Sequence, residues 1–304
     1  MIKRLGFFVF FLGGFFLFGQ QPQVEIMVLG IAQDAGAPQI QCKKDCCRDR
    51  WQKQDLEQVS ALGIVDRSNA GIYLIDSTPD IGEQLQAAQS YFNAPLKGIF
   101  LTHAHIGHYS GLMYLGKEAL GAKKVPVYAM ERMRNFLSHN GPWSQLVQGQ
   151  NILLQPLTNE MELSLSPQLQ VTPLRVPHRD EYSETVGYRI QGPKKSALYI
   201  PDIDKWNQWE KDILAAIKEV DYAFLDATFY DGKELGNRDM SLIPHPFVKE
   251  SMQLFEVLSP KERNKIYFIH LNHTNPLLKR ESKAYKALLS KGYHLAQTGQ
   301  TFTL

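Results

Sequence analysis

The stretch "LKGIFLTHAHIGHYSG" (residues 96–111) carries the most informative pattern in the chain, a predicted strand that runs directly into three histidines. Its first seven residues are mostly apolar and typical of a β-strand. His103, His105 and His108 follow at once. Imidazole nitrogen is a good ligand for zinc, iron and similar ions, so this spacing predicts a metal site at the end of a strand. Gly107 stands directly before His108, at a place where one more acidic ligand is expected.

Three further side chains able to bind metal follow predicted strands elsewhere in the chain. His178 comes after "LQVTPLRVP", Asp202 after "SALYIP" and His270 after "KIYFI". In layered α/β folds, the loops after strands bring side chains from distant parts of the sequence into one site. One histidine at a strand end is usually a surface residue, but four such places that all offer His or Asp favour a metal site.

Apolar runs and turn residues divide the rest of the chain into strands and helices. Between residues 151 and 200, short apolar runs alternate with turn residues, which indicates successive antiparallel strands. Because strands and helices mix in both halves without a repeat or a linker, the pattern predicts a single α/β domain over residues 21–304, with helices covering layered sheets. We expect further strands at 24–30, 70–77, 125–129, 222–226 and 265–270, and helices at 80–92, 112–120, 206–220, 247–258 and 280–290.

The composition is that of an ordinary soluble globular protein. Of the 304 residues, 44% are hydrophobic and 21% are charged. The formal net charge is only +2, so we expect no broad basic surface and no nucleic-acid partner. The sequence carries no signal for the oligomeric state.

Residues 1–20 have the layout of a secretory signal peptide. Lys3 and Arg4 form a short basic start, and residues 5–18 form an apolar run without charge that is too short to span a bilayer comfortably. Gly19 before Gln20 is a candidate cleavage point. We therefore expect an exported protein, periplasmic or extracellular, that meets the membrane only through this leader. The alternative is an uncleaved membrane anchor.

The three cysteines, Cys42, Cys46 and Cys47, all lie in "CKKDCCRDR" (42–50). Three thiolates this close are compatible with a structural zinc site that takes one ligand from elsewhere in the chain, although the usual two-residue spacing between paired cysteines is missing. The alternative is a surface loop with one local disulfide or with free thiols, and the odd count leaves at least one thiol unpaired in that case.

Several motifs resemble one known family. "THAHIGH" (102–108) resembles the H-x-H-x-D-H motif of the metallo-β-lactamase superfamily, and "YLID" (73–76) matches the strand that ends in aspartate in that family. "VLGIAQDAGAPQIQC" (28–42) and "IYFIHLNHTNPLL" (266–278) are similar to segments of the pyrroloquinoline-quinone biosynthesis B proteins (PqqB). The resemblance spans about residues 24 to 300.

This resemblance implies an αββα four-layer sandwich with a metal site at one edge. It assigns His103, His105 and His178 to a first metal position, and His108 and His270 to a second, with Asp202 bridging the two and serving as the catalytic residue. Asp76 would support the histidine loop through hydrogen bonds; the alternative is a turn former at a strand end. Cys42 and Cys47 match the outer cysteines of the structural zinc site in PqqB-like proteins, whereas Lys44 stands at the middle one.

Gly107 departs from the motif, because the hydrolytic members carry there an aspartate that binds the second metal. We therefore expect one tight divalent metal ion, with zinc favoured and iron or manganese as alternatives, and a weak second position. Asp204, His245 and His273 are candidates to compensate, and the alternative, favoured for each of them, is an ordinary surface polar residue. An aspartate at position 107 is expected to strengthen the second position.

Three functions are compatible with this site. The leading hypothesis is a hydrolase that acts on an ester, phosphodiester or amide bond in a small-molecule or short peptide substrate, with metal-activated water as the nucleophile. A second, from the PqqB resemblance, is the oxidation of a peptide-derived precursor in pyrroloquinoline quinone biosynthesis, for which iron is suited. A third is a non-catalytic metal- or ligand-binding protein on this fold.

Overall fold

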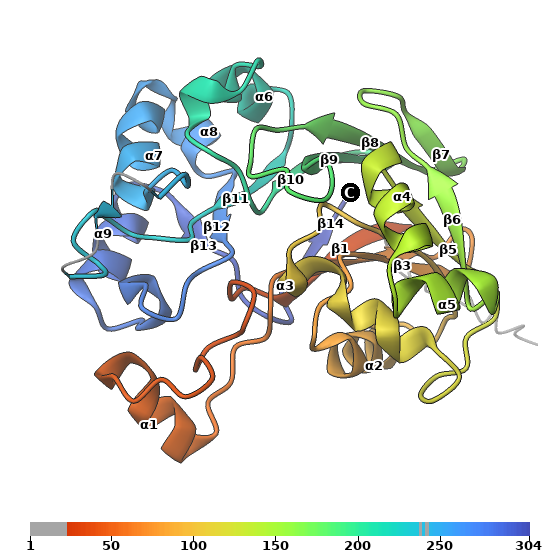
Figure 1. Cartoon of the computed structure of the whole chain (residues 1–304). Helices are drawn as coiled ribbons and strands as arrows, with labels where there is room; N and C mark the ends of the chain where they lie inside the picture. Colours follow the sequence, from red (N-terminus) through yellow and green to blue (C-terminus); the bar gives the residue numbers. More distant parts are fainter. Residues whose placement is uncertain (1–22, 237–238, 241–242) are drawn as a thin grey trace, which may run out of the picture.

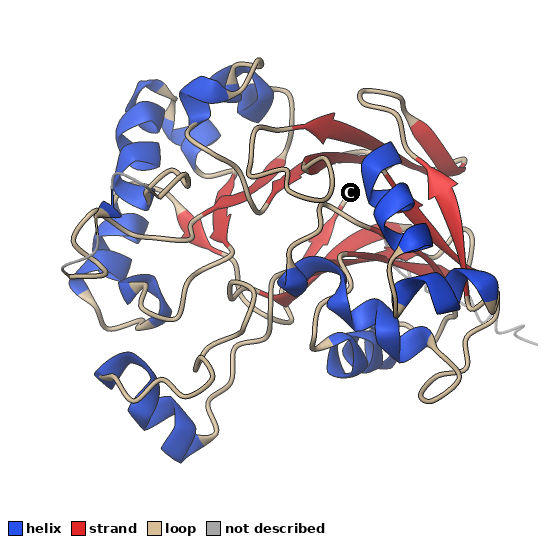
Figure 2. Cartoon of the chain, viewed as in Figure 1, coloured by secondary structure: helices blue, strands red, loops and turns tan. Residues whose placement is uncertain are grey.

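The computed structural model describes residues 23–236, 239–240 and 243–304, so the predicted leader, residues 1–20, lies outside the described residues. Within them the strands form two sheets packed face to face, and helices flank the pair on both outer sides (Figures 1 and 2). This arrangement confirms the expected αββα sandwich.

The first sheet comes mainly from the N-terminal half of the chain. Its strand order is β14-β1-β2-β3-β4-β5-β6. Strands β1 to β3 pair antiparallel, and β3 to β6 run parallel. The bounds are β1 Val24–Gly30, β2 Ala61–Asp66, β3 Gly71–Ile75, β4 Leu96–Phe100, β5 Val125–Ala129, β6 Ile152–Pro156 and β14 Thr301–Thr303.

The second sheet has the order β13-β12-β11-β10-β9-β8-β7. Strands β7 to β10 pair antiparallel, which confirms the expectation for residues 163–200, and β10 to β13 run parallel. The expectation is wrong for the first run of the 151–200 segment, because β6 pairs parallel to β5 in the first sheet. The bounds are β7 Leu163–Ser166, β8 Leu169–Arg175, β9 Val186–Gln191, β10 Ser196–Ile200, β11 Tyr222–Asp226, β12 Ile266–Ile269 and β13 His294–Leu295.

Helices lie on the outer faces of both sheets (Figure 1). The α-helices of the described residues are α1 Asp45–Lys53, α2 Ile81–Tyr91, α3 Ile106–Tyr109, α4 Glu131–His139, α5 Trp143–Gln148, α6 Ile213–Lys218, α7 Val248–Leu254, α8 Pro260–Arg263 and α9 Lys283–Ser290. The short 3-10 helices are η1 Ser110–Leu115, η2 Trp206–Gln208, η4 Phe255–Val257 and η5 Pro276–Leu278. Among the described helices, none has the length and apolar character needed to cross a membrane.

Strand β1 is buried on both of its faces, each face packing in a different apolar core. Val24, Ile26 and Val28 are buried in the core shared with the second sheet, whereas Met27 and Leu29 are buried in a separate core under the outer helices. Successive side chains of a strand point to opposite faces, so the apolar run from Ile26 to Leu29 predicts a strand covered on both sides. This double burial fixes the first sheet in the middle of the sandwich.

Several strands of both sheets end at the same edge of the sandwich, and the polar side chains that follow these strands therefore gather at that edge. The loops after β3, β4, β8, β10, β11 and β12 all begin at this edge, and the loop after β1 joins it through a bridge between Ala32 and Leu271. Carboxyl ends of strands are where an open α/β sheet assembles a site, and this edge is where the sequence predicts a metal site.

Candidate metal centre

All six side chains predicted to bind metal lie together at this edge of the sandwich. His103, His105, His178 and Asp202 have ligand atoms that all lie within 4.8 Å of one another. Asp202 forms a second such group with Asp226 and His270, and His108 belongs to a third group that also contains His270. The side chains of five of the six are buried, and that of His105 is partly exposed.

The first position is built around the carboxylate of Asp202. One of its oxygens lies 3.3 Å from His103 Nε2 and 3.8 Å from His105 Nδ1, and the other lies 3.3 Å from His178 Nε2. His178 Nε2 and Asp202 Oδ1 are both buried, and beyond their own contact and the 3.1 Å contact of Asp202 Oδ1 with His245, neither atom has a hydrogen-bond partner among the described residues. Buried polar atoms without partners are costly, and a divalent cation satisfies a set of nitrogens and a carboxylate aimed at one point. The residues present therefore fit a metal ion.

The outer ring nitrogens at the first position are tied to other residues. His103 Nδ1 lies 3.0 Å from Thr102 Oγ1, and His178 Nδ1 lies 3.0 Å from Asp204 Oδ1. Such contacts fix the tautomer and the orientation of a ligating imidazole. Asp204, a candidate to compensate for Gly107, therefore orients His178 and does not fill the second position.

The second position holds two histidines whose Nε2 atoms lie 3.2 Å apart, those of His108 and His270. His108 Nδ1 lies 2.7 Å from Asp76 Oδ2, and His270 Nδ1 lies 3.0 Å from Thr228 Oγ1. Asp76 also accepts the backbone N–H of Thr102 at 2.8 Å, so it supports the histidine loop as the family resemblance implies. Asp76 and His270 both have positive φ values, 71° and 65°, a strained backbone that clusters at functional sites.

His245 and Asp226 stand behind Asp202. His245 Nδ1 lies 2.9 Å from Asp226 Oδ2 and 3.1 Å from Asp202 Oδ1. His245 therefore lies on the Asp202 side of the site and does not replace the carboxylate missing beside His108. Asp226 is a residue that the sequence analysis missed, although it ends the predicted strand "YAFLD" as Asp202 follows "SALYIP".

Burial and the neighbouring charges shift the pKa values of the histidines and of Asp202 at the first position. Burial lowers the pKa of His103 well below its usual value, and the nearby His108 adds to this. Burial also opposes charge on His178, but the Asp202 carboxylate outweighs it and raises the pKa of His178 to about 9. Despite its own burial, Asp202 has a pKa held well below the usual range by His178 and His245. Because ligands must lose their protons, a metal ion entering this site would displace protons.

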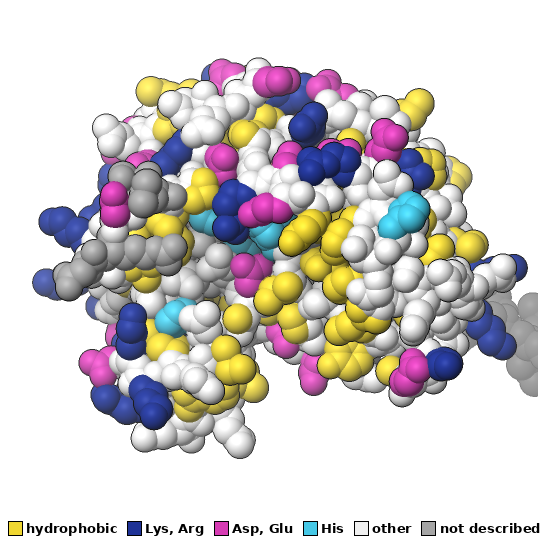
Figure 3. Space-filling model, viewed as in Figure 1, with side chains coloured by type: hydrophobic (Ala, Val, Ile, Leu, Met, Phe, Trp, Pro, Cys, Tyr) yellow, Lys and Arg dark blue, Asp and Glu magenta, His cyan; other side chains and the backbone are white. Residues whose placement is uncertain are grey.

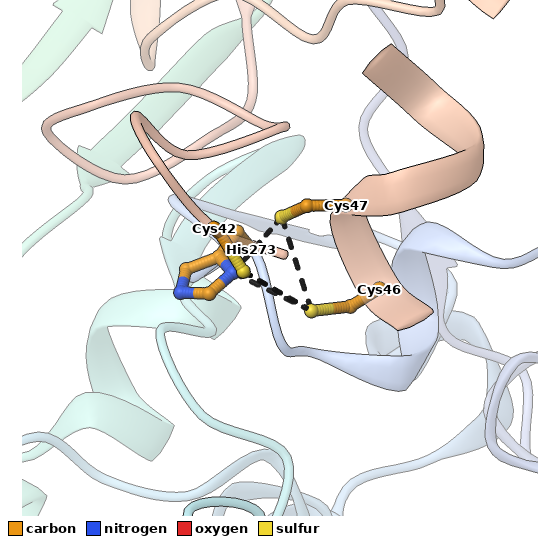
Figure 4. A group of neighbouring side chains, drawn as sticks. All are labelled: Cys42, Cys46, Cys47 and His273. Carbon is orange, nitrogen blue, oxygen red and sulfur yellow. Dashed lines mark hydrogen bonds between the residues drawn. The ribbon is translucent and has the colours of Figure 1, made fainter. Parts of the chain in front are cut away.

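The cysteine cluster gains its fourth member from the other end of the chain. Cys46 and Cys47 lie in the first turn of α1, Cys42 precedes them, and His273 comes from the loop after β12 (Figure 4). His273 is thus not a substitute ligand at the second metal position. It is the outside ligand that the structural zinc hypothesis requires.

The distances within this cluster suit a tetrahedral metal ion. The sulfur of Cys46 lies 4.0 Å from that of Cys42 and 3.8 Å from that of Cys47, and His273 Nδ1 lies 3.2 Å from the Cys47 sulfur. Thiolates bound to zinc at about 2.3 Å with tetrahedral angles lie roughly 3.8 Å apart. All three cysteines are free in this structure. Burial and the adjacent Cys47 raise the pKa of Cys46 to about 12, so this thiol needs a cation nearby to ionise.

A pocket of about 390 Å³ opens between the two clusters. Its lining includes Asp34, Arg179, Phe229, Ile243, His245 and His273. Figure 3 shows histidine side chains in a hollow near the middle of this face, with acidic and basic groups at its edge. The pocket gives a small ligand access to the side of the metal centre that carries His245.

The comparisons with known proteins agree with this geometry. The family model described as a β-lactamase superfamily domain matches residues 72–271. The coenzyme PQQ synthesis protein B of Xanthomonas oryzae pv. oryzae is 25% identical, over 92% of this chain and 100% of its own length.

Two solved structures share the fold. Zinc-bound PqqB from Methylobacterium extorquens superposes with a TM-score of 0.76 at 22% identity, over 92% of this chain and 100% of that one. A diphosphatase from the PhnP family superposes with a TM-score of 0.62 at 23% identity, over 92% of this chain and 96% of that one. With the family model covering well over half of its length, the chain belongs to the β-lactamase superfamily, has the metallo-β-lactamase fold and is PqqB-like.

Proposed function

We propose that the protein is a metal-dependent hydrolase. The observation that carries this proposal is Asp202, a buried carboxylate that reaches both groups of ligands: His103, His105 and His178 on one side and His270 on the other. A divalent ion held there supplies an activated water molecule at neutral pH and polarises the bond to be cleaved. A carboxylate shared between two positions is typical of hydrolytic sites of this kind.

The residues of the chain have separate tasks in this proposal. Asp202 orients the attacking water and accepts its proton. His245 and Asp226 hold Asp202 through the contacts at 3.1 Å and 2.9 Å described above. Arg179, at the edge of the pocket and 3.5 Å from His105 Nε2, is placed to hold a carbonyl or phosphoryl oxygen of the substrate.

The pocket sets the size of the substrate. A volume of about 390 Å³ suits a small molecule or the end of a short peptide. Phe229 and Ile243 offer apolar contacts, and Asn272 offers hydrogen bonds. This supports an ester, phosphodiester or amide of modest size that carries an apolar group.

Hydrolysis is tested with protein that is stripped of metal and reloaded with zinc or manganese. We expect turnover of at least one of three chromogenic substrates, 4-nitrophenyl acetate, bis(4-nitrophenyl) phosphate or a peptide 4-nitroanilide. Asp202→Asn should lower kcat/KM by about 10³-fold or more, because a carboxylate ligand shared by both positions and the proton acceptor are lost together. Glu219→Gln, which alters an exposed carboxylate paired with Arg189, should have no effect. Metal-loaded protein inactive on all three would favour a non-catalytic metal- or ligand-binding role.

A second function is supported by the likeness to proteins named for PQQ synthesis. In this alternative the site binds iron, and the protein oxidises a peptide-derived precursor with molecular oxygen. The predicted export opposes it, because cofactor biosynthesis is expected in the cytoplasm. Oxygen consumption that requires both ferrous iron and a tyrosine-containing peptide would favour this alternative over hydrolysis, and zinc-loaded protein should then be inactive.

We propose that the protein acts outside the cytoplasm after removal of residues 1 to about 20, from the basic start and the apolar run of the leader. Mature protein isolated from the native cell should begin near residue 20. N-terminal sequencing or intact mass measures this directly. Mature protein that keeps Met1 would contradict the proposal and favour the membrane anchor.

A further inference from the structure

The space beside His108 is already occupied by a side chain from another part of the chain. A Cβ atom added to Gly107 would lie 2.5 Å from Cα and 2.5 Å from Oδ1 of Asp34. Asp34 belongs to the loop that follows β1, so a carboxylate from that loop reaches the place where the family motif has its aspartate.

The Asp34 carboxylate is aimed at the second position. Its Oδ1 lies 3.7 Å from His108 Nε2, and the ligand atoms of Asp34, His108 and His270 all lie within 4.8 Å of one another. Oδ1 is buried and has no hydrogen-bond partner among the described residues. A carboxylate oxygen withdrawn from water without a partner costs free energy that a bound cation offsets.

The backbone holds Asp34 in this place. Gln33 N–H donates to the Leu271 carbonyl at 2.8 Å, and Leu271 N–H donates to the Ile31 carbonyl at 2.7 Å. These bonds join the loop to the residue next to His270. Asp34 itself has a φ of 21°, outside the usual range for a side chain of this size. A ligand fixed in advance relative to its partners loses little entropy when the metal binds.

The two histidines present the matching atoms. Their Nδ1 atoms are taken by Asp76 and Thr228, so their Nε2 atoms are the ones left to bind an ion. We infer that Asp34 supplies the carboxylate ligand of the second metal position, together with His108, His270 and the shared Asp202. Asp34 thereby replaces the motif aspartate that Gly107 lacks, and the second position is a full one in place of the weak one expected from the motif.

The same geometry corrects the expectation for position 107. An aspartate there would not add a ligand, because its Cβ would collide with the Cα of Asp34. Gly107 is needed for the loop after β1 to approach, as glycine often is where two backbones meet closely. The inference extends the proposed function, since a filled second position places two cations at the Asp202 carboxylate.

Manganese binding to the zinc-free mature chain tests the inference without any assay of activity. Mn2+ prefers carboxylate and imidazole to thiolate, so it reports on the metal centre and not on the cysteine cluster. The parent should bind two ions per chain, and their magnetic coupling through Asp202 should remove the resolved hyperfine spectrum of isolated Mn2+ in electron paramagnetic resonance. Asp34→Asn should bind the second ion about 100-fold more weakly or worse, and should show the spectrum of an isolated ion.

Two further variants sharpen the result. Asp34→Gly removes the carboxylate with a residue that accepts the positive φ, so it should behave as Asp34→Asn does even if the amide is poorly tolerated. Asp55→Asn makes the same chemical change at an exposed carboxylate paired with Arg50 and should bind as the parent does. The inference is overturned if the parent binds one Mn2+, or if either folded Asp34 variant keeps the second ion with parental affinity. If the Asp34 variants lose the second ion but the parent hydrolyses none of the substrates, the inference about Asp34 stands and only the proposed hydrolase function is contradicted.

Discussion

His178→Ala is expected to remove the metal ion from the first position, and His103→Ala to do the same. Each change deletes one of three imidazoles that converge on Asp202, with His103 Nε2 and His178 Nε2 both 3.3 Å from its oxygens. Loss of residues that merely support a ligand costs 10- to 100-fold in affinity, so loss of a ligand itself should cost about 100-fold or more. Elemental analysis after dialysis should find at least one metal ion fewer per chain.

Thermal unfolding gives an independent measure of the same loss. A ligand present at about 1,000 times its Kd stabilises the folded state by roughly 4 kcal/mol, so added metal should raise the Tm of the parent and raise that of His178→Ala much less. His139→Ala is the matched control, because His139 is an exposed histidine on α4 that bonds only to the Asn135 carbonyl among the contacts found for it. Unchanged metal content in both His103→Ala and His178→Ala would remove the ligand assignment.

The sequence predicts much of this fold because apolar runs mark the strands. Residues 24–30, 125–129 and 222–226 are strands with the expected bounds. The helix expected at 112–120 is instead α3 followed by η1, which ends at Leu115. The helical turn stops at Gly116, whose backbone is extended (φ −66°, ψ 171°) and whose N–H donates to the Met113 carbonyl. The apolar spacing predicts the helical start but not this early end at a glycine.

Local sequence patterns also predict only part of the metal centre. The strand-end histidines and Asp202 were predictable because each directly follows an apolar run and matches a motif. Asp34 was not, because it lies in a loop that is irregular in sequence and reaches His108 only through the path of the backbone between β1 and Leu271. His273 is only a candidate for the second metal position in the sequence, because sequence order places it three residues from His270 and gives no sign that it turns toward the cysteines of α1.

We propose that the cysteine cluster holds zinc, and removal of that ion is expected to release α1 from the rest of the protein. Among the described residues, α1 stands apart from the sandwich (Figure 1), and its contacts to the loop after β12 include the cluster and a bond of 3.0 Å from Arg50 Nη2 to the Leu278 carbonyl. Structural zinc binds zinc-finger peptides with apparent free energies of about 10–16 kcal/mol, far more than one such hydrogen bond contributes. The metal should therefore dominate the docking of this segment.

Cys47→Ser and His273→Ala should each lose one tightly bound zinc, while the Mn2+ content of the metal centre stays unchanged. Amide hydrogen exchange in residues 42–53 should become about 100-fold faster or more, with little change in the strands, because the loss is local to one weakly packed segment. His139→Ala again serves as the histidine control.

The alternative at this cluster is a disulfide, which an exported protein could form. The sulfur separations of 3.8 Å and 4.0 Å match two thiolates on one tetrahedral ion and are nearly twice the length of an S–S bond of about 2.05 Å. Alkylation of native protein without reductant, after chelation, should modify all three cysteines. Modification of a single cysteine, with no zinc in the native protein, would show that two of the three cysteines are paired and that His273 has no metal to bind. In that case the disulfide and the Arg50 hydrogen bond would hold α1 in place. His273→Ala would then leave the rate of amide hydrogen exchange in residues 42–53 unchanged.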